Sequence, residues 1–375
     1  MTYKKSFDSD ILFAGYYGHS NTGDDAFVEV ASWGAEKYWS KSKSIFLAKQ
    51  DNLPITSKKI KGYPFSIPKT YSLQRRLLLS STDYLISAGG STIHGELETN
   101  NIKRLAVESK KKGSKITVGG IGVSIGPFKT LIDEKSTIEY LKNIDFLAVR
   151  DKTSFDFASS LNLPYETVDA FDLAALLPEI YGIKMQNNLS SKKVIGISVC
   201  PYESISNTAN IENEKKRNAT VVELLKILNR EENIHFKFFI INGHAKVGDQ
   251  KLTKETIEKV SPDSYEVIPY TRKTQSIWDA IASCDFVIST RLHAAIFACF
   301  SNTPFMLNEY HRKCGDFLEN IGYEESLRMF DSEYQPKKIA KDIIEILNDK
   351  SKYVYPKRID EMRNLAELNF TGVDI

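Results

Sequence analysis

Short apolar runs alternate with helix-length segments along most of the chain, and this alternation constrains the fold more than any other feature. Runs of four to six β-branched and aromatic residues between Gly or polar turns are typical of strands that are buried on both faces. A first series of such runs occupies 10–18, 44–49, 83–91, 115–124 and 145–151. A second series occupies 194–200, 236–243, 265–270, 285–291 and 303–308.

The segments between these runs have helical spacing. In ATVVELLKILNREE at 219–232, for example, Val222, Leu225 and Leu228 recur on one helix face. Strands that alternate with helices form parallel sheets. Because the polar segment QNNLSSKK at 186–193 separates the two series, we expect an α/β protein with two Rossmann-like domains whose parallel sheets face a cleft.

These patterns define three regions. We expect an N-terminal Rossmann-like domain at 1–185 and a C-terminal Rossmann-like domain at 190–350. The remaining tail, 351–375, contains the helix-like stretch RIDEMRNLAELNF and is expected to pack back on the N-terminal domain. A chain of 375 residues is long enough for two domains of ordinary size.

Composition excludes several classes of function. The chain has 50 Lys and Arg against 48 Asp and Glu, a formal charge of +2, which argues against a nucleic-acid-binding protein. Its four cysteines show no CxxC spacing, so neither a metal site nor a disulfide framework is predicted. There is no signal-peptide pattern and no run of about 18 apolar residues. We therefore expect a cytoplasmic protein, with peripheral contact to the inner membrane left open; nothing in the sequence indicates an oligomeric state.

Ligands of parallel α/β sheets bind beyond the carboxyl ends of the strands. The residues that directly follow each strand, here called the strand exits, are therefore the first candidates for a functional site. In STRLHAA at 289–295, Arg291 and His293 lie between a predicted strand and an apolar helix. An Arg there can bind a carboxylate or phosphate with two parallel hydrogen bonds, and a His can transfer a proton near neutral pH. The alternative is that Arg291 pairs with a structural carboxylate and His293 caps the helix. We favour the functional interpretation, because placing both side chains between two apolar elements is otherwise costly.

Two further exits supply cations. In VRD at 149–151, Arg150 follows a strand and Asp151 is placed as the N-cap of the next helix. Arg150 is equally compatible with an opposing cation across the cleft and with a buried salt-bridge partner. Lys313, in NEYHRK after the last strand, extends the basic exits.

The exit of the first strand is GYYGHSNTGDDA at 15–26. Its glycines allow close approach of the backbone to another group. Asp24 and Asp25 are placed to begin a helix, where the dipole favours carboxylates, although this explains one of them better than both. The chain has neither a GxGxxG fingerprint nor a GxxxxGK[ST] loop, so no dinucleotide site and no P-loop are predicted.

Taken together, the exit motifs resemble those of the polysaccharide pyruvyltransferase family. The resemblance runs from about 11 to 315 in the same order; it is carried by GYYGHSNTGDDA, AGGS at 88–91, GIGVSIGPF at 120–128, VRDKTS at 149–154, DAFDLA at 169–174, STRLHAAIFA at 289–298 and EYHRK. It implies a fold similar to that of the type B glycosyltransferases. It also implies transfer of the enolpyruvyl group of phosphoenolpyruvate onto two hydroxyls of a sugar residue, which forms a pyruvate ketal on a polysaccharide or glycan precursor and releases phosphate. No metal and no other cofactor is implied.

The chemistry of phosphoenolpyruvate then assigns roles. The phosphoenolpyruvate-binding candidates are Arg150, Arg291, Leu292, His293 and Lys313. The catalytic candidates are His293, as general acid, with Arg291 and Asp24. The acceptor-binding candidates are Tyr17, His19, Asn21, Asp24, Asp25, His94 and Glu96; for His94 and Glu96 an ordinary surface-loop position fits as well. The identity of the general base is left open, as is the choice between a free, lipid-linked and polymeric acceptor.

Two alternatives remain. A nucleotide-sugar-dependent glycosyltransferase of the same architecture would use Arg291 and Lys313 to hold a diphosphate. A non-catalytic glycan-binding protein would use Tyr16 and Tyr17 to stack on a sugar ring. Because fold alone cannot separate these functions, the donor substrate is the distinguishing observation.

Overall fold

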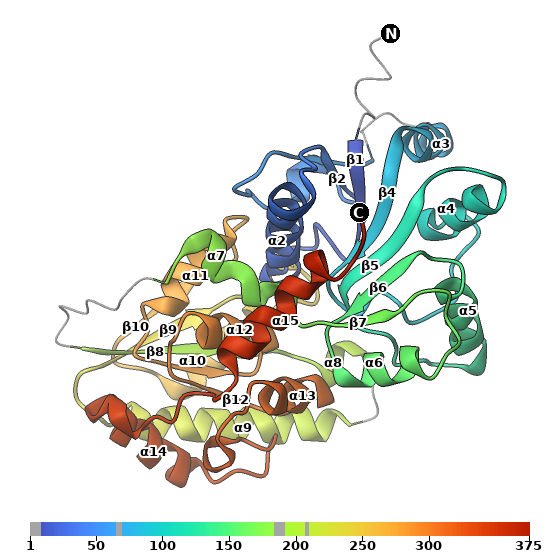
Figure 1. The fold of residues 1–375 in the computed structure, drawn as a ribbon. Coiled ribbons are helices and arrows are strands. Elements are labelled where there is room, and N and C mark those ends of the chain that lie inside the picture. Colours follow the sequence, from blue (N-terminus) through green and yellow to red (C-terminus); the bar gives the residue numbers. More distant parts are fainter. Residues whose placement is uncertain (1–8, 65–69, 184–191, 207–209) are drawn as a thin grey trace. The chain divides into compact units, whose positions relative to one another are not determined.

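The computed structural model describes residues 9–64, 70–183, 192–206 and 210–375, and contains two parallel sheets (Figure 1). The chain divides into two compact units. Unit 1 comprises Met1–His19, Asp24–Ile180 and Glu361–Ile375. Unit 2 comprises Ser20–Gly23 and Tyr181–Asp360. Most of the polar segment expected to separate the two series, 186–191, lies outside the described residues.

The sheet of unit 1 has seven strands in the order β3-β2-β1-β4-β5-β6-β7, and every neighbouring pair is parallel. The strands are β1 (Ser9–Ala14), β2 (Ser44–Phe46), β3 (Ile60–Gly62), β4 (Thr82–Ala88), β5 (Thr117–Val123), β6 (Phe146–Val149) and β7 (Thr167–Asp169). Ile11, Leu12 and Phe13 of β1 are completely buried. A strand that is covered on both faces requires such a continuous apolar run rather than an alternating one.

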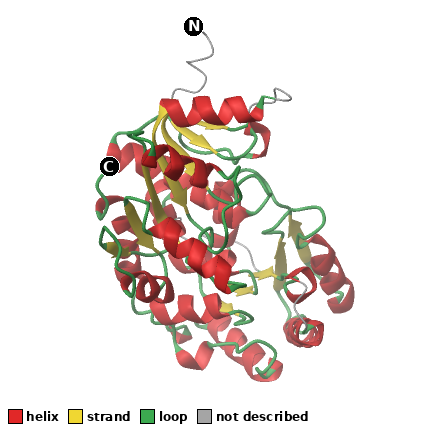
Figure 2. Cartoon of the chain, turned by 90° about the vertical axis from the view of Figure 1, so that its right-hand side faces the viewer, coloured by secondary structure: helices red, strands yellow, loops and turns green. Residues whose placement is uncertain are grey.

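Helices flank the strands of each sheet (Figure 2). Those that lie wholly or mainly in unit 1 are α2 (Thr22–Trp39), α3 (Tyr71–Ser81), α4 (Ile102–Lys111), α5 (Leu131–Leu141), α6 (Lys152–Ser159), α7 (Leu177–Tyr181) and α15 (Ile359–Thr371). Asp151 caps α6 as predicted, because its side chain accepts a hydrogen bond from the Ser154 N–H at 2.9 Å. The 3-10 turns Gln50–Asn52 and Leu173–Leu176 complete this unit.

The sheet of unit 2 has five parallel strands in the order β10-β9-β8-β11-β12. They are β8 (Lys193–Ser198), β9 (Ile234–Phe239), β10 (Tyr265–Ile268), β11 (Phe286–Ser289) and β12 (Phe305–Leu307). The helices are α8 (Glu203–Ser206), α9 (Ile211–Leu228), α10 (Gln250–Val260), α11 (Thr274–Ala282), α12 (Leu292–Phe300), α13 (Arg312–Asn320) and α14 (Pro336–Asn348), with 3-10 turns at Glu325–Leu327 and Lys350–Lys352.

Each apolar run in the two predicted series coincides with a strand, but β3 and β7 were not predicted. Both are three-residue strands at the outer edges of the unit 1 sheet. Their residues are only partly covered, so no continuous apolar run marks them in the sequence.

The C-terminal helix α15 packs within unit 1. The Trp39 indole donates a hydrogen bond to the Phe370 carbonyl at 2.9 Å, and the two rings lie 5.1 Å apart. The Asn369 side chain is fully buried: its amide oxygen accepts from the Gly122 N–H at 2.5 Å and its amide nitrogen donates to the Phe171 carbonyl at 2.8 Å. The last helix is therefore joined by hydrogen bonds to the exit of β5. Of the helices described, none has both the length and the apolar character needed to cross a membrane.

Both sheets contain a point at which the strand order reverses. In unit 1 the chain builds outward from β1 to β3 and then returns to the other side of β1 with β4. In unit 2 the same reversal separates β8 from β11. The connections leave such a pair of strands in opposite directions, so a crevice forms beyond their carboxyl ends, where ligands of this fold class bind. These two switch points locate the candidate sites.

Candidate active site

Arg291 lies at the switch point of unit 2, between β11 and α12. The Thr290 N–H donates to the Ser198 carbonyl at 2.7 Å, which ties the exits of β11 and β8 together. Arg291 is the N-cap residue of α12, with an extended backbone and no capping hydrogen bond from its side chain. The N–H groups of the first helical turn therefore face the exit without a side-chain cap, and the helix dipole favours an anion there.

The guanidinium of Arg291 is held by a buried carboxylate, Asp249. Its Nε and Nη2 donate to Asp249 Oδ1 at 2.9 and 2.5 Å, and the second carboxylate oxygen accepts from the Asn242 N–H at 2.8 Å. Asp249 is completely buried, whereas the Arg291 side chain is 19% exposed. Burial alone would lower the pKa of Arg291, but the neighbouring Cys200 and Asp249 raise it above its ordinary value. Arg291 therefore remains a cation with a fixed orientation.

His293 lies against the opening glycine motif. A Cβ built on Gly23 would be only 2.2 Å from His293 Nδ1, so no side chain fits at this position beside the ring as it is placed. The Gly23 N–H donates to the Asn21 side chain at 3.1 Å, which closes a tight turn in front of the imidazole. The opening motif and the Arg291–His293 motif, which are about 270 residues apart in the sequence, thus meet in unit 2.

The same short segment is bound to the exit of β9. The Thr22 N–H donates to the Ile241 carbonyl at 2.9 Å, and the Gly243 N–H donates to the Ser20 carbonyl at 2.7 Å. These bonds explain why Ser20–Gly23 group with unit 2 while Asp24 and the rest of α2 group with unit 1. Of the acceptor-binding candidates, Asn21 consequently lies in unit 2, where its side chain accepts a hydrogen bond from the Gly23 N–H.

Lys313 is in the first turn of α13, after β12, which pairs with β11. It is half-buried, and its N–H donates to the Nδ1 of the N-cap residue His311 at 3.2 Å. Burial, and secondarily the charges of Lys313 and Arg312, lower the pKa of His311. His311 is therefore neutral at neutral pH and can act as the hydrogen-bond acceptor that this cap requires.

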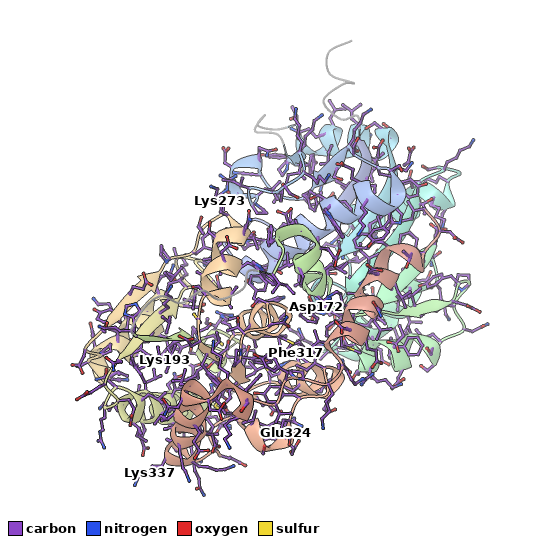
Figure 3. All side chains as sticks on the ribbon, turned by 60° about the vertical axis from the view of Figure 1, so that its left-hand side comes forward. Asp172, Lys193, Lys273, Phe317, Glu324 and Lys337 are labelled. Carbon is purple, nitrogen blue, oxygen red and sulfur yellow. The ribbon has the colours of Figure 1, made fainter. Side chains whose placement is uncertain are left out.

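Arg150, at the exit of β6 in unit 1, has the contacts of a buried salt-bridge partner. Its Nη1 donates to Asp172 Oδ2 at 2.7 Å and its Nε to the Ser124 hydroxyl at 2.8 Å. The side chains of Arg150 and Asp172 are 9% and 7% exposed. Asp172, labelled in Figure 3, also caps the following 3-10 turn through the Ala174 N–H. Arg150 thus links the exits of three consecutive segments of unit 1.

The switch point of unit 1 contains a cavity of about 580 Å³, here called the unit 1 pocket. It lies beyond β1 and β4 and is bounded by the first turn of α4. It is lined by Ala14, Gly15, Tyr16, Asp24, Leu47, Tyr63, Arg75, Gly90, Ser91, Thr92, His94, Asn100, Asn101, Ile102 and Lys103. Two of the predicted acceptor-binding residues, Asp24 and His94, are in this lining.

The structure corrects the expectation for Tyr17. Its ring folds back over Gly15 and is only 3% exposed, and its hydroxyl donates to the Ala88 carbonyl at the end of β4 at 2.7 Å. It therefore has no free ring face to offer a sugar. The neighbouring Tyr16 is 56% exposed, lines the unit 1 pocket and stacks on His19, with ring centroids 4.1 Å apart.

The acceptor candidates Asp25 and Glu96 also lie outside the pocket lining, as do His19 and Asn21. Asp25 is 1% exposed in the first turn of α2, so Asp24 is the aspartate that faces the cavity. Glu96 is exposed, and its N–H donates to the Asp133 side chain at 3.2 Å. Its position is that of an ordinary surface-loop residue, one of the two readings left open by the sequence.

Three residues at these sites were not singled out by the sequence. Asp249 closes the exit segment NGHAKVGD, but only the fold brings it under Arg291. Lys103 is the second residue of α4, for which Asn101 acts as N-cap. A lysine in the first turn of this helix is the signal that could have pointed to it. Arg75 comes from α3, and nothing in the sequence around it indicates a site.

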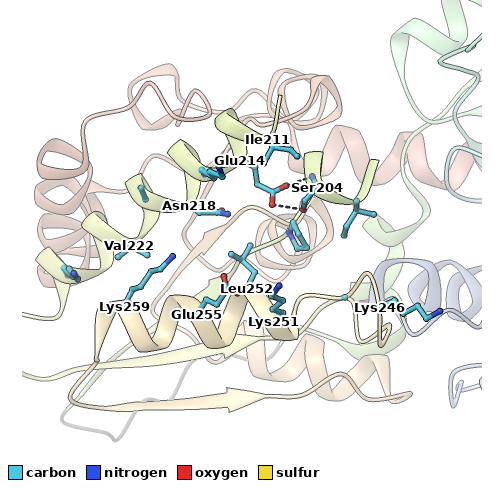
Figure 4. A pocket seen from close by; sticks show the side chains of 16 residues that line it. Ser204, Ile211, Glu214, Asn218, Val222, Lys246, Lys251, Leu252, Glu255 and Lys259 are labelled. Carbon is cyan, nitrogen blue, oxygen red and sulfur yellow. Dashed lines mark hydrogen bonds between the residues drawn. The ribbon is translucent and has the colours of Figure 1, made fainter. Parts of the chain in front are cut away.

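Unit 2 contains a second cavity of about 690 Å³ between α9 and α10 (Figure 4). Its lining includes Lys246, Lys251 and Lys259 but neither Arg291 nor His293. Glu214, on its wall, accepts hydrogen bonds from the N–H groups of Tyr202 and Ser204. Pro201, which follows β8, and Gly248, next to Asp249, also line this cavity, so it reaches the strand exits of unit 2 without including Arg291 or His293. In the described part of the chain, no cluster of three or more His, Cys, Asp and Glu is arranged to hold a metal ion.

Comparison with known proteins identifies the family. Residues 21–312 match the family described as "Polysaccharide pyruvyl transferase". The chain belongs to the polysaccharide pyruvyl transferase family. The match includes Asn21, Arg150, Arg291 and His293, and confirms the resemblance that the exit motifs indicate. This family is one of transferases, and it implies a sugar or glycan acceptor. No curated protein matches the chain in sequence.

The fold of this pyruvyl transferase family member is similar to that of several solved structures over nearly its whole length. S. aureus MnaA, solved with UDP, superposes with a TM-score of 0.60 at 12% identity, over 96% of this chain and 93% of that one. UDP-GlcNAc 2-epimerase from Neisseria meningitidis, bound to UDP-GlcNAc, has a TM-score of 0.56 at 12% identity, covering 96% and 97%. Sucrose-phosphate synthase from Thermosynechococcus elongatus has a TM-score of 0.53 at 8% identity, covering 97% and 94%. This chain has two parallel-sheet α/β units. Together with these structural neighbours, they confirm the expected type B glycosyltransferase-like fold class.

Proposed function

We propose that the protein transfers the enolpyruvyl group of phosphoenolpyruvate onto two hydroxyls of a sugar residue, forming a pyruvate ketal on a polysaccharide or glycan precursor. The observation that carries this proposal is the meeting of two motifs in unit 2. An oriented arginine, Arg291, and a histidine, His293, lie at one switch point, with the turn of the opening motif packed on the imidazole. Membership of the pyruvyl transferase family supports the same reaction class.

Phosphoenolpyruvate carries a carboxylate and a phosphate, so its site needs more than one cationic or N–H donor group. We assign these roles to Arg291, to Lys313 on the adjacent exit, and to the first turn of α12, which begins with Leu292 and His293. The Asp249 carboxylate fixes the plane of the Arg291 guanidinium before the substrate arrives. Such pre-orientation lowers the entropic cost of binding the anion. Arg150 holds the exits of unit 1 together in this scheme, and we assign it no direct contact with the donor.

Ketal formation begins with proton transfer to the methylene carbon of phosphoenolpyruvate. We assign His293 as the general acid; the methylene becomes a methyl group and the adjacent carbon becomes an oxocarbenium-like centre. One sugar hydroxyl adds to this centre and gives up its proton. The C–O bond to phosphate then breaks, and the second hydroxyl closes the ring. The two hydroxyl protons balance the one taken up by the methylene and the one carried away by phosphate.

We place the acceptor sugar in the unit 1 pocket. Asp24 offers a carboxylate to sugar hydroxyls, and the exposed ring of Tyr16 offers an apolar face to the sugar. His94 lines the same cavity. A carboxylate and an aromatic ring beside a cavity of this size suit the hydroxyls and the apolar face of a sugar ring.

A second candidate function is nucleotide-sugar-dependent glycosyl transfer. It is favoured by the fold likeness to S. aureus MnaA, solved with UDP, and to the Neisseria meningitidis epimerase, bound to UDP-GlcNAc. In that case Arg291 and Lys313 would hold a diphosphate. The donor that is consumed separates the two functions.

The decisive experiment offers the protein phosphoenolpyruvate or UDP-sugars with a panel of galactosides, glucosides and N-acetylmannosaminides, each in a neutral and a phosphorylated form. Mass spectrometry should reveal a product heavier by pyruvate minus water, together with phosphate release. His293→Gln should abolish this product, whereas the matched control His235→Gln, on β9 beside Ser264, should retain it. Turnover of a UDP-sugar without consumption of phosphoenolpyruvate would overturn the proposal in favour of the second candidate.

A further inference from the structure

Two cations line the unit 1 pocket without a carboxylate partner among the described residues. Lys103, at the start of α4, is 8% exposed, and its Nζ donates one hydrogen bond, to the Thr92 carbonyl at 2.9 Å. Arg75, on α3, donates from Nη1 to the Asn100 carbonyl at 2.7 Å, and its buried Nε makes no hydrogen bond to the residues that the structure describes. Neither side chain takes part in an ion pair with any described residue.

The position of Lys103 is unusual, because buried charges in proteins are normally paired, whereas Arg75 is half-buried. An ammonium has three N–H donors, and Lys103 uses one of them. Both cations converge on the pocket from different helices, together with the first turn of α4, which contributes Asn101 and Ile102 to the lining. The positive end of the helix dipole adds to the same field. Three sources of positive potential thus face one cavity.

The burial of Lys103 disfavours its charged form, which lowers its pKa. Burial lowers the pKa of Lys103 to about 8. At neutral pH the ammonium is therefore retained against an unfavourable environment. A bound anion would offset that desolvation, because an opposite charge within hydrogen-bond distance favours the charged form.

We propose that the acceptor sugar itself carries an anionic group, phosphoryl or carboxylate, which binds Lys103, Arg75 and the N-terminus of α4. That this ligand is the acceptor rests on the proposed function, whereas the presence of an anion-binding subsite does not. The Asp24 carboxylate in the lining repels an anion, so the charged group of the ligand binds toward α3 and α4 and its hydroxyls lie toward Asp24. The ligand is thus an anionic sugar rather than a neutral one.

Equilibrium binding without phosphoenolpyruvate tests the subsite apart from turnover. The probes are galactose, glucose and N-acetylmannosamine, the 1-phosphates of all three, galacturonate, glucuronate and inorganic phosphate, measured by titration calorimetry. One phosphorylated or carboxylated sugar should bind at least about 10-fold more tightly than its neutral form, as expected for charge-assisted hydrogen bonds. Comparison of the phosphates with the uronates then identifies which anionic group the subsite takes.

Three variants locate the effect. Lys103→Met retains the apolar stem and should weaken binding of the anionic sugar by about 10- to 100-fold, with less than about 2-fold change for the neutral form. Arg75→Gln, at the edge of the pocket, should act in the same direction, which keeps the test informative if Lys103→Met folds poorly. Lys111→Met, on the solvent-facing end of α4 near Glu139, is the matched control and should leave binding unchanged.

Equal affinity for the neutral and anionic forms of every sugar would overturn the proposal. So would inorganic phosphate binding as tightly as the best sugar phosphate, which would mark a site for a free ion only. Pyruvyl transfer confined to neutral sugars would refute the anionic acceptor while leaving the proposed function intact. Conversely, tight binding of an anionic sugar with no transfer from phosphoenolpyruvate would support the subsite and refute the function.

Discussion

Replacement of Lys103 by methionine should make the protein more stable at neutral pH, although it removes a hydrogen bond. The pKa of Lys103 is lowered by burial from 10.5 to about 8. A shift of roughly 2.5 units corresponds to about 3 kcal/mol of unfavourable free energy for keeping the folded lysine charged at pH 7. Methionine fills nearly the same space and carries no charge. Loss of the bond to the Thr92 carbonyl costs about 1 kcal/mol, so the net stabilisation is about 2 kcal/mol.

The difference in stability between the variant and the wild type should change with pH. The folded lysine loses its proton near pH 8, whereas the unfolded lysine keeps it until about pH 10.5. Between these values the unfolded state binds more protons, so the wild-type protein gains stability as pH rises. The Lys103→Met variant lacks this gain. Its advantage should therefore be largest at pH 7 and below, and should vanish or reverse by about pH 10.

Urea unfolding at pH 7 and at pH 10 measures the effect as the difference between variant and wild type. Lys111→Met, whose side chain is exposed on the same helix, controls for the general effect of high pH and should show little change at either pH. Two results would refute the prediction: a Lys103→Met variant that is less stable than wild type at pH 7, or a difference in stability that is the same at both pH values. Either outcome would mean that Lys103 is not a destabilising buried cation.

Three further substitutions address the two units. Gly23→Ala should lower kcat at least about 100-fold with near-normal unfolding, because the new Cβ would displace the His293 ring from a position 2.2 Å away; normal turnover would show that the contact is not needed. Asp249→Asn should raise the KM for phosphoenolpyruvate and lower the free energy of unfolding by about 3 kcal/mol, since it removes the carboxylate of a largely buried pair with Arg291; unchanged values in donor titrations and urea unfolding would contradict this. Asn369→Ala should cost about 2 kcal/mol in urea unfolding and expose the C-terminal helix to limited proteolysis without changing the KM for phosphoenolpyruvate; resistance to protease equal to that of wild type would count against it.

Much of the architecture could be predicted because it depends on local patterns. Buried parallel strands need continuous apolar runs, and runs such as ILFA of β1 and FVIS of β11 are visible without any partner. The capping role of Asp151 is equally local, since the side chain bonds an N–H three residues away. The short edge strands β3 and β7 were missed, because partial exposure removes the apolar signal.

The candidate sites also contain residues that the sequence indicates and partners that only the structure reveals. Arg291 and His293 could be found as polar residues at a strand exit, but their partners could not. Asp249 reaches Arg291 across 42 positions, and Gly23 meets His293 only because residues 20–23 bond to the exit of β9. Such pairings are set by sheet order, which leaves no mark on the neighbouring sequence.

The sequence by itself determined the fold class, the family and the positions of the strand exits, because periodicity and exit motifs are properties of adjacent residues. Tertiary structure alone decided which exits share a switch point, that Tyr17 is buried and Tyr16 exposed, and that Lys103 and Arg75 converge on one cavity. The physical reason is that burial and electrostatic pairing depend on neighbours brought together from distant segments. A lysine is ordinary in a helix sequence; only its desolvation beside a pocket makes it a candidate ligand-binding group.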